Sequence, residues 1–317
     1  MPLSPLNKEE KCAGAVLFGL ALGDALGWPV EFKQLHEIQA IYGPKGIQNP
    51  PNPALYTDDT QMTIALTEGI LDAGVNAPID AIMEKVGARF IAWSKHPETD
   101  LRAPGNTCLK GVRAYKSGVP WRESGLNGSL GCGSAMRVAT IGYLYQNQPE
   151  RLREVASASS MITHGHSGAV ASAVAAAYAV KLALDGVSPD EYVQRIMDFV
   201  GDMSPEFDTA ILRIGHVLAW TDELEAVKHI GQGWIATEAV AVALYAVMKY
   251  PTSFVGAVRL GANHSGDSDS TASIAGGVSA ALLGIESIPE DWIERCEHRD
   301  EIVDLVRRMA HAKSMIG

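Results

Sequence analysis

The sequence has few of the residues that thiolate metal sites and disulfide frameworks require. Its 317 residues include four cysteines, Cys12, Cys108, Cys132 and Cys296, which lie far apart and form no CxxC pair. Neither a thiolate zinc site nor a disulfide-stapled fold is therefore indicated, and four reduced thiols are the simplest interpretation.

Positive charge is also in short supply. The chain has 26 Lys and Arg residues against 37 Asp and Glu residues, which gives a formal net charge of −11. A field of this sign repels phosphate, so we expect no nonspecific binding to nucleic acid or to an anionic membrane. A polyanionic substrate would need locally favourable contacts.

A basic leader and a long apolar span are missing as well. Residues 1–11 are polar and charged, so the apolar stretch 12–23 lacks the lead of a secretory signal. The uncharged run 165–180 is shorter than the roughly 20 apolar residues that a membrane-spanning helix needs. We therefore expect a cytoplasmic protein without a membrane partner.

Strand-like alternation is scarce, and the sequence contains no Ser/Gly linker and no repeat of solenoid period. Apolar residues instead recur at helical spacing, as in the segments that follow Thr60 and Asp208. This pattern predicts a single all-α domain over residues 1–317. Further helices are expected over 8–26, 78–94, 133–147, 150–162, 167–185, 189–200, 235–249, 270–284 and 298–313. Loops are expected over 28–56, 96–106, 118–133 and 263–268.

An acidic cluster precedes one of the predicted helices. It contains Thr57, Asp58, Asp59 and Thr60 and should lie at a helix N-terminus, where one Thr or Asp side chain can cap exposed amides. A simple cap is one interpretation. However, a cap needs a single such residue, whereas this segment presents two hydroxyls and two carboxylates together.

A second cluster, Asp267, Asp269 and Ser270, repeats this chemistry ahead of the small-residue run 272–284, with a capped glycine-rich turn as the alternative. If the fold brings both clusters together, four carboxylates repel one another strongly unless cations neutralise them. Oxygen donors suit hard ions such as Mg²⁺ or Mn²⁺. Such a pair of ions can supply an activated water at neutral pH.

A glycine-rich helix leads to a third acidic element. Gly19, Gly23 and Gly27 are four residues apart and share one helical face, where they would permit close helix packing although each weakens the helix. Pro29 disfavours helical geometry at the residue before it, which places Glu31 on a loop. A solvated Glu31 is the alternative to a functional one.

Together these stretches resemble the ADP-ribosylglycohydrolase family over nearly the whole chain. Segments 23–32, 57–60 and 266–270 look like the family's first, second and last motifs, in the same order. The resemblance implies an orthogonal multi-helix bundle with a binuclear Mg²⁺ or Mn²⁺ centre. The implied metal ligands are Thr57, Asp58, Asp59, Asp267, Asp269 and Ser270. Some relatives carry Thr at the position of Ser270, and either hydroxyl can coordinate.

The resemblance also implies the catalytic residues Glu31, Asp58, Asp59 and Asp100. In the family, the counterpart of Glu31 lies beside the metals and the scissile ribose, either as an acid/base or as a gate. Asp100 falls near a position where arginine-specific relatives carry a substrate-facing carboxylate.

Three middle segments, 102–108, 131–137 and 163–166, resemble the walls of the family's ADP-ribose groove. The implied substrate contacts are Gly105, Asn106, Thr107, Gly131, Gly133, Ser134, Met136 and His164. Gly131 and Gly133 allow the backbone close to a ligand, and a helix starting near Ser134 would aim free N–H groups at a diphosphate. Packing is the alternative role for Met136, and a satisfied buried position is the alternative for His164.

The implied reaction is release of ADP-ribose from a modified protein side chain, arginine first, or from a small-molecule acceptor. Water activated by the metals and a carboxylate such as Asp59 would attack the anomeric carbon while the leaving group is protonated. One alternative is another dinuclear-metal nucleotide hydrolase. The other is a noncatalytic, immunity-type protein that binds ADP-ribose or an ADP-ribosyltransferase. A monomer is expected because no coiled-coil heptad run occurs.

Overall fold

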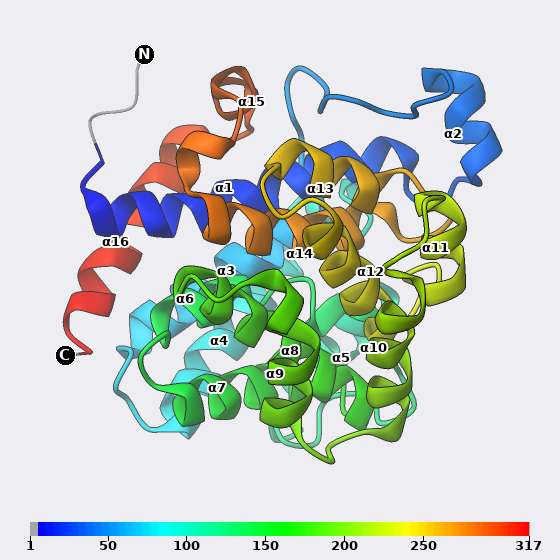
Figure 1. The fold of residues 1–317 in the computed structure, drawn as a ribbon. Coiled ribbons are helices and arrows are strands. Elements are labelled where there is room, and N and C mark those ends of the chain that lie inside the picture. Colours follow the sequence, from blue (N-terminus) through cyan, green and yellow to red (C-terminus); the bar gives the residue numbers. More distant parts are fainter. Residues whose placement is uncertain (1–5, 317) are drawn as a thin grey trace.

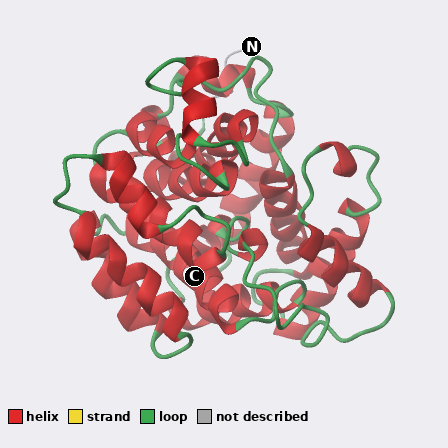
Figure 2. Ribbon diagram, turned by 90° about the vertical axis from the view of Figure 1, so that its right-hand side faces the viewer, coloured by secondary structure: helices red, strands yellow, loops and turns green. Residues whose placement is uncertain are grey.

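The structure, a computed structural model, describes residues 6–316. Within that range it contains α-helices, short 3₁₀ turns and two isolated bridges, and no strand (Figure 2). The predicted all-α fold class is therefore confirmed. The α-helices are α1 (Lys8–Gly27), α2 (Leu35–Tyr42), α3 (Asp58–Ala73), α4 (Ile79–Trp93), α5 (Asn106–Lys116), α6 (Ala139–Leu144), α7 (Pro149–Met161), α8 (Ser167–Leu184), α9 (Tyr192–Val200), α10 (Pro205–Val217), α11 (Glu223–Ile230), α12 (Ala236–Lys249), α13 (Phe254–Ala262), α14 (Ser268–Leu283), α15 (Glu290–Arg295) and α16 (Arg299–Ser314).

Helices α1 and α14 run side by side through the middle of the molecule, although they come from opposite ends of the chain (Figure 1). The glycine face of α1 makes this approach possible. A Cβ added at Gly23 would lie 2.1 Å from the carbonyl oxygen of Ala272, and one added at Gly19 would lie 2.4 Å from that of Gly276. The close packing expected of the α1 glycines is present, and its partner is the helix that carries the second acidic cluster.

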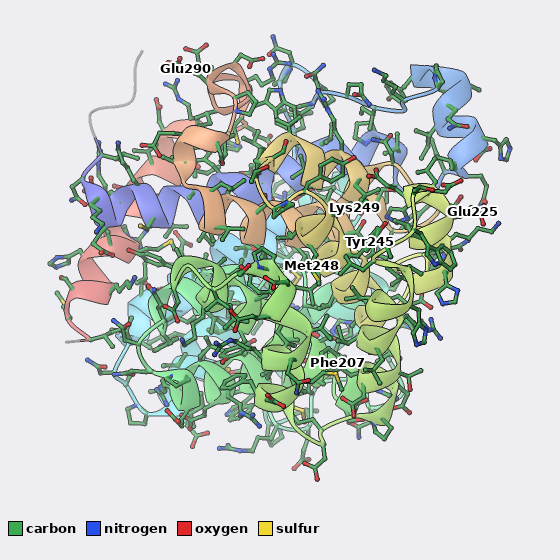
Figure 3. The ribbon with its side chains drawn as sticks, viewed as in Figure 1. Phe207, Glu225, Tyr245, Met248, Lys249 and Glu290 are labelled. Carbon is green, nitrogen blue, oxygen red and sulfur yellow. The ribbon has the colours of Figure 1, made fainter. Side chains whose placement is uncertain are left out.

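The remaining helices surround this pair and share one continuous hydrophobic core. Charged side chains such as Glu225 and Glu290 project from the outer edge of the molecule (Figure 3). By length and composition alone two helical segments, Lys8–Val30 and Ser167–Leu184, could cross a membrane. The fold buries 89% and 78% of their apolar windows, as expected for core helices.

The helices expected over 8–26, 78–94, 150–162, 167–185, 235–249, 270–284 and 298–313 agree with α1, α4, α7, α8, α12, α14 and α16 to within two residues at each end. The helix expected over 189–200 is a 3₁₀ turn, η4 (Pro189–Glu191), followed by α9. Shorter helices were not predicted: α2 lies inside the expected loop 28–56, and α5, α11, α13 and α15 also have few turns in which a period could emerge.

The single helix predicted over 133–147 is wrong. The segment forms a 3₁₀ turn, η3 (Cys132–Ser134), and α6, which begins only at Ala139. In a continuous helix the carbonyl of Gly133 would accept the backbone N–H four residues on. Here that carbonyl accepts the buried guanidinium of Arg137 at 2.6 Å, so the side chain replaces the backbone donor and the helix is interrupted.

Candidate active site

The two acidic clusters lie at the N-termini of α3 and α14, and these two helix ends lie close together. Asp58 and Asp59 form the first turn of α3, where Thr57 is the N-cap, and Asp267 is the N-cap of α14. The hydroxyl of Ser270 donates to Asp59 Oδ1 at 3.5 Å, which joins residues 211 positions apart. Four carboxylates from distant parts of the sequence therefore share one site.

Glu31, on the loop after α1, adds a further carboxylate to this acidic site. It follows the 3₁₀ turn η1 (Trp28–Val30), which succeeds the glycine-rich helix α1. Trp28 keeps a helical backbone (φ −53°, ψ −45°), contrary to the effect expected of Pro29, but Glu31 does lie on the loop that follows. Carboxylate oxygens of Glu31, Asp267 and Asp269 lie within 4.8 Å of one another. The backbone N–H of the next residue, Phe32, donates to the Gly266 carbonyl at 2.8 Å and ties this loop to the tip of α14.

Burial and mutual repulsion disfavour the charged forms of these carboxyls. Burial, followed by the charges of Asp267 and Asp58, raises the pKa of Glu31 to about 9. Burial raises the pKa of Asp58 to about 8, although the N–H of Gly105 donates to its Oδ2 at 3.0 Å and opposes the shift. The pKa values of Asp59 and Asp269 are raised for the same reasons, burial first. Without cations the site holds protons at neutral pH.

The donor set fits hard divalent cations. Asp59 is buried and its Oδ2 has no hydrogen-bond partner, which costs free energy unless a ligand is bound there. Carboxylate and hydroxyl oxygens at this spacing are the ligands that Mg²⁺ and Mn²⁺ prefer. Cys132 is the exception, because its Sγ lies 2.8 Å from Asp267 Oδ2.

Asp24 supports the site from behind. This buried side chain of α1 accepts hydrogen bonds from the N–H groups of Thr57 and Thr60 and from the Thr60 hydroxyl, at 2.5 to 3.1 Å. Burial raises its pKa to about 6, and these donors oppose the shift. The carboxylate thus caps α3 and holds its first turn in place. The sequence places Asp24 in the first motif but does not indicate this role.

A cleft of about 220 Å³ opens over the acidic N-termini of α3 and α14. Its walls include most of the expected substrate contacts and most of the expected metal ligands and catalytic residues: Glu31, Asp58, Asp59, Gly105, Asn106, Thr107, Gly131, Gly133, Met136, His164, Asp267, Asp269 and Ser270.

Three expected site residues lie outside the walls of this cleft. Thr57 is buried beneath the first turn of α3, where its hydroxyl accepts the N–H of Asp59 at 3.3 Å. Ser134 is buried and donates to the carbonyl of Ala169. Asp100 is exposed on the 3₁₀ turn η2 (Thr99–Leu101).

The helix start expected near Ser134 is also absent, because α6 begins at Ala139. The free N–H groups that were expected at Ser134 to bind a diphosphate are therefore not provided there. Besides α3 and α14, helix α5 begins at the cleft wall: its first residues Asn106 and Thr107 line the cleft, and its N-cap Gly105 offers no capping side chain.

His164 is a buried, neutral histidine at the base of the cleft. Burial, followed by the charge of Arg137, lowers its pKa to about 3. Its Nδ1 pairs with the Thr163 hydroxyl at 2.9 Å, and a Cβ added at Gly131 would lie 3.4 Å from its Nε2. The side chain is thus both a satisfied buried histidine and part of the cleft wall.

Two aromatic side chains, Phe32 and Trp234, also line the cleft, although the sequence did not predict a role for either. Phe32 and Trp234 stack with ring centroids 5.1 Å apart and planes 13° apart. Their exposures are 56% and 47%, so both rings have free faces. Phe32 lies in the first motif, whereas no pattern in the sequence singles out Trp234.

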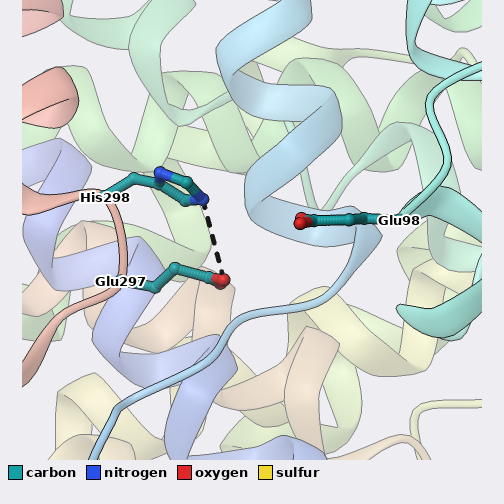
Figure 4. A group of neighbouring side chains, drawn as sticks. All are labelled: Glu98, Glu297 and His298. Carbon is teal, nitrogen blue, oxygen red and sulfur yellow. Dashed lines mark ion pairs between the residues drawn. The ribbon is translucent and has the colours of Figure 1, made fainter.

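A second acidic group, Glu98, Glu297 and His298, lies outside the cleft (Figure 4). Its chemistry differs because the guanidinium of Arg102 donates to both carboxylate oxygens of Glu297, at 2.7 and 2.5 Å. His298 Nε2 lies 3.7 Å from the same carboxylate. A cation there would have to displace the guanidinium, so this group is an ion pair that braces the fold.

Comparison with known proteins identifies the family of this chain. The family described as ADP-ribosylglycohydrolase matches residues 4–315. The chain is 28% identical to ADP-ribosylhydrolase ARH3 of Mus musculus, over 81% of this chain and 76% of that protein. It is 26% identical to ADP-ribosylarginine hydrolase Tri1 of Serratia proteamaculans, over 97% of this chain and 81% of that protein.

The fold has a close counterpart among solved structures. An ADP-ribosylglycohydrolase-related protein complex superposes with a TM-score of 0.74 and 24% identity, over 97% of this chain and all of that one. A match of the family over nearly the whole chain, on a fold of the same type, shows that this chain belongs to the ADP-ribosylglycohydrolase family.

Proposed function

We propose that the cleft hydrolyses the bond between the distal ribose of ADP-ribose and an acceptor, with an arginine side chain as the first candidate. Two Mg²⁺ or Mn²⁺ ions would be held by Thr57, Asp58, Asp59, Asp267, Asp269 and Ser270. The observation that carries the proposal is the meeting of the α3 and α14 tips, where Ser270 Oγ lies 3.5 Å from Asp59 Oδ1. The similarity to a protein named ADP-ribosylarginine hydrolase supports arginine as the acceptor.

When bound, the ions would polarise the ribose hydroxyls and supply an activated water. The chain's own carboxyls would move the protons. Asp59, a buried carboxylate beside the expected ions, is the candidate to accept a proton from the attacking water. Glu31, whose carboxylate lies beside those of Asp267 and Asp269, could give a proton to the leaving nitrogen or oxygen, or act as a gate.

The diphosphate would lie at the start of α5. Its N-cap Gly105 provides no side chain, so the N–H groups of Asn106 and Thr107 remain available at the cleft wall. Backbone N–H groups and the positive end of a helix dipole stabilise bound phosphate. This would provide the local attraction that an acidic protein needs for a polyanionic substrate.

Product analysis tests the proposal. The protein with Mg²⁺ or Mn²⁺ is incubated with acceptors ADP-ribosylated on arginine, on serine or on a nucleobase, and the products are identified by mass spectrometry. We expect free ADP-ribose from the arginine conjugate, whereas AMP would indicate a nucleotide phosphohydrolase.

Variants of the acidic tips distinguish an enzyme from a noncatalytic binder. The double variant Asp58→Ala/Asp267→Ala should release no ADP-ribose, while the control Asp100→Ala, outside the cleft walls, should retain release. If the double variant still protected a target from an ADP-ribosyltransferase as well as the wild type does, simple binding would explain the protection.

A further inference from the structure

Cys132 places a sulfur atom among the oxygen donors of the metal site. It begins the 3₁₀ turn η3, is half-buried, and lines the cleft. Its Sγ lies 2.8 Å from Asp267 Oδ2 and 3.3 Å from Ser270 Oγ, two expected metal ligands at the tip of α14. Ser270 Oγ in turn contacts Asp59 Oδ1. The thiol therefore belongs to the same contact network as the carboxylates.

These separations suit a metal ion bound to sulfur and oxygen together. Zn²⁺ binds thiolate sulfur at about 2.3 Å and carboxylate oxygen at about 2.0 Å, which places the two donor atoms about 3.5 Å apart in a tetrahedral site. The sulfur of Cys132 is already 3.3 Å from Ser270 Oγ and 2.8 Å from Asp267 Oδ2. Only a small movement of the Asp267 carboxylate away from the sulfur is needed.

An independent observation indicates that a ligand belongs here. Asp59 is 2% exposed, lines the same cleft, and leaves Oδ2 without a hydrogen-bond partner. A buried carboxylate oxygen without a donor is costly unless a cation binds it. Asp59 can therefore add an oxygen to the donors that Cys132, Asp267 and Ser270 provide.

We propose that Cys132 lets this centre capture thiophilic divalent ions such as Zn²⁺ and Cd²⁺, and that a captured ion excludes the hard ions expected to support hydrolysis. A sulfur–metal bond would form at Cys132, and the thiol proton would pass to water. Mg²⁺ and Mn²⁺ favour oxygen and leave the thiol unbound, whereas softer ions gain a sulfur ligand. The activating role of the hard ions rests on the proposed function, but the capture of thiophilic ions does not.

A cadmium titration of the metal-stripped full-length protein tests this inference. Thiolate binding to Cd²⁺ produces an ultraviolet charge-transfer band, which we expect to saturate at one Cd²⁺ per chain and to disappear in Cys132→Ser. The matched control is Cys108→Ser: Cys108 lines the same cleft, but its sulfur contacts the Gly133 carbonyl and Arg137 rather than a carboxylate. The control should keep the band.

A second readout uses Zn²⁺ as a competitor for Mn²⁺, measured by the Mn²⁺ electron paramagnetic resonance signal. Loss of the sulfur ligand should raise the Zn²⁺ concentration that displaces half of the Mn²⁺ by at least about 10-fold. Cys132→Ala should behave like Cys132→Ser, and thermal melts of both metal-free variants check that they fold.

Three results would overturn the inference: no charge-transfer band in the wild type, a band that survives in folded Cys132→Ser, or a band lost in folded Cys108→Ser. These results are separate from the fate of the proposed function. A protein that shows the band but releases no ADP-ribose keeps the inference and loses the function. A protein that releases ADP-ribose but shows no band does the reverse.

Discussion

Gly27, the last residue of α1, lies directly against the backbone of Asp269, a proposed metal ligand. A Cβ at Gly27 would be 2.5 Å from Asp269 Cα and 2.4 Å from the carbonyl oxygen of Ser268. Real Cβ atoms do not approach backbone this closely, so any side chain here must push the α14 tip away. The absence of a side chain at Gly27 of α1 thus sets where Asp269 of α14 lies.

Gly27→Ala should therefore weaken divalent-ion binding as well as the fold. We expect a loss of about 1–3 kcal/mol of unfolding free energy through overpacking. Mn²⁺ affinity should also fall by at least about 10-fold, the usual cost of disturbing the support of a metal ligand. Urea unfolding and calorimetric titration with Mn²⁺ measure the two effects. The control is Gly14→Ala on the same helix, where the added Cβ meets the flexible end of Ile285 at 2.9 Å.

The stability of the metal-free protein should fall as pH rises. Burial and like charges raise the pKa of Asp58 to about 8 and that of Glu31 to about 9, whereas carboxyl groups in the unfolded chain have a pKa of about 4. Between about pH 4 and pH 8 the folded state therefore binds more protons than the unfolded state, and stability present below this window is lost across it.

Urea unfolding at pH 5 and pH 8 measures this effect, with EDTA in one series and Mn²⁺ in the other. The decline should occur with EDTA and should diminish or reverse with Mn²⁺, because the ion favours the charged carboxylates. Equal pH dependence in the two series would mean that the cluster does not bind the ion.

The aromatic pair at the cleft should contribute to substrate binding. Trp234→Leu removes the larger ring of the Phe32–Trp234 stack, whose free faces can receive a planar group of the substrate. Stacking of a base on an aromatic side chain contributes about 1–3 kcal/mol, so KM should rise about 5- to 100-fold with a smaller change in kcat. Steady-state kinetics with the ADP-ribosylated arginine conjugate measures this. Trp220→Leu, an exposed tryptophan outside the cleft walls, should leave KM unchanged.

Arg102 should stabilise the acidic tip of α3 through its ion pair. Its guanidinium donates to the carbonyl of Tyr56 and to Glu297, and its own carbonyl accepts the N–H of Asp58 at 3.1 Å. The two charged side chains are only 10% and 11% exposed. Arg102→Met removes the guanidinium partner of Glu297, which then keeps only the Tyr56 N–H and the nearby His298, and should cost about 3–5 kcal/mol of unfolding free energy.

The double variant Arg102→Met/Glu297→Leu should lose less stability than Arg102→Met alone, because no buried charge is left over. Denaturant unfolding of the wild type, both single variants and the double variant gives the coupling between the two side chains. Strictly additive losses would show that the pair does not interact in solution.

Much of the helical framework could be predicted from local patterns. Helices such as α4 and α16 have enough turns for apolar periodicity to mark them, and α1 gives way to the 3₁₀ turn η1 beside Pro29, which has no N–H to donate. The interruption before α6 could not be predicted in this way. It depends on Arg137, whose guanidinium donates to the Gly133 carbonyl. The same guanidinium also donates to the Ser159 carbonyl and the Thr163 hydroxyl, at the C-terminal end of α7.

The acidic helix tips were recognisable because carboxylates and hydroxyls gather at predicted N-termini, beyond what a cap requires. By itself the sequence determined the helical class, the long helices and the residues of these tips, since each depends on neighbours a few positions away. Only the tertiary structure decided that Cys132 contacts Asp267, that Trp234 stacks on Phe32, and that Asp100 lies outside the cleft walls. These relationships join residues distant in the chain, and they follow from the packing of whole helices rather than from any local spacing.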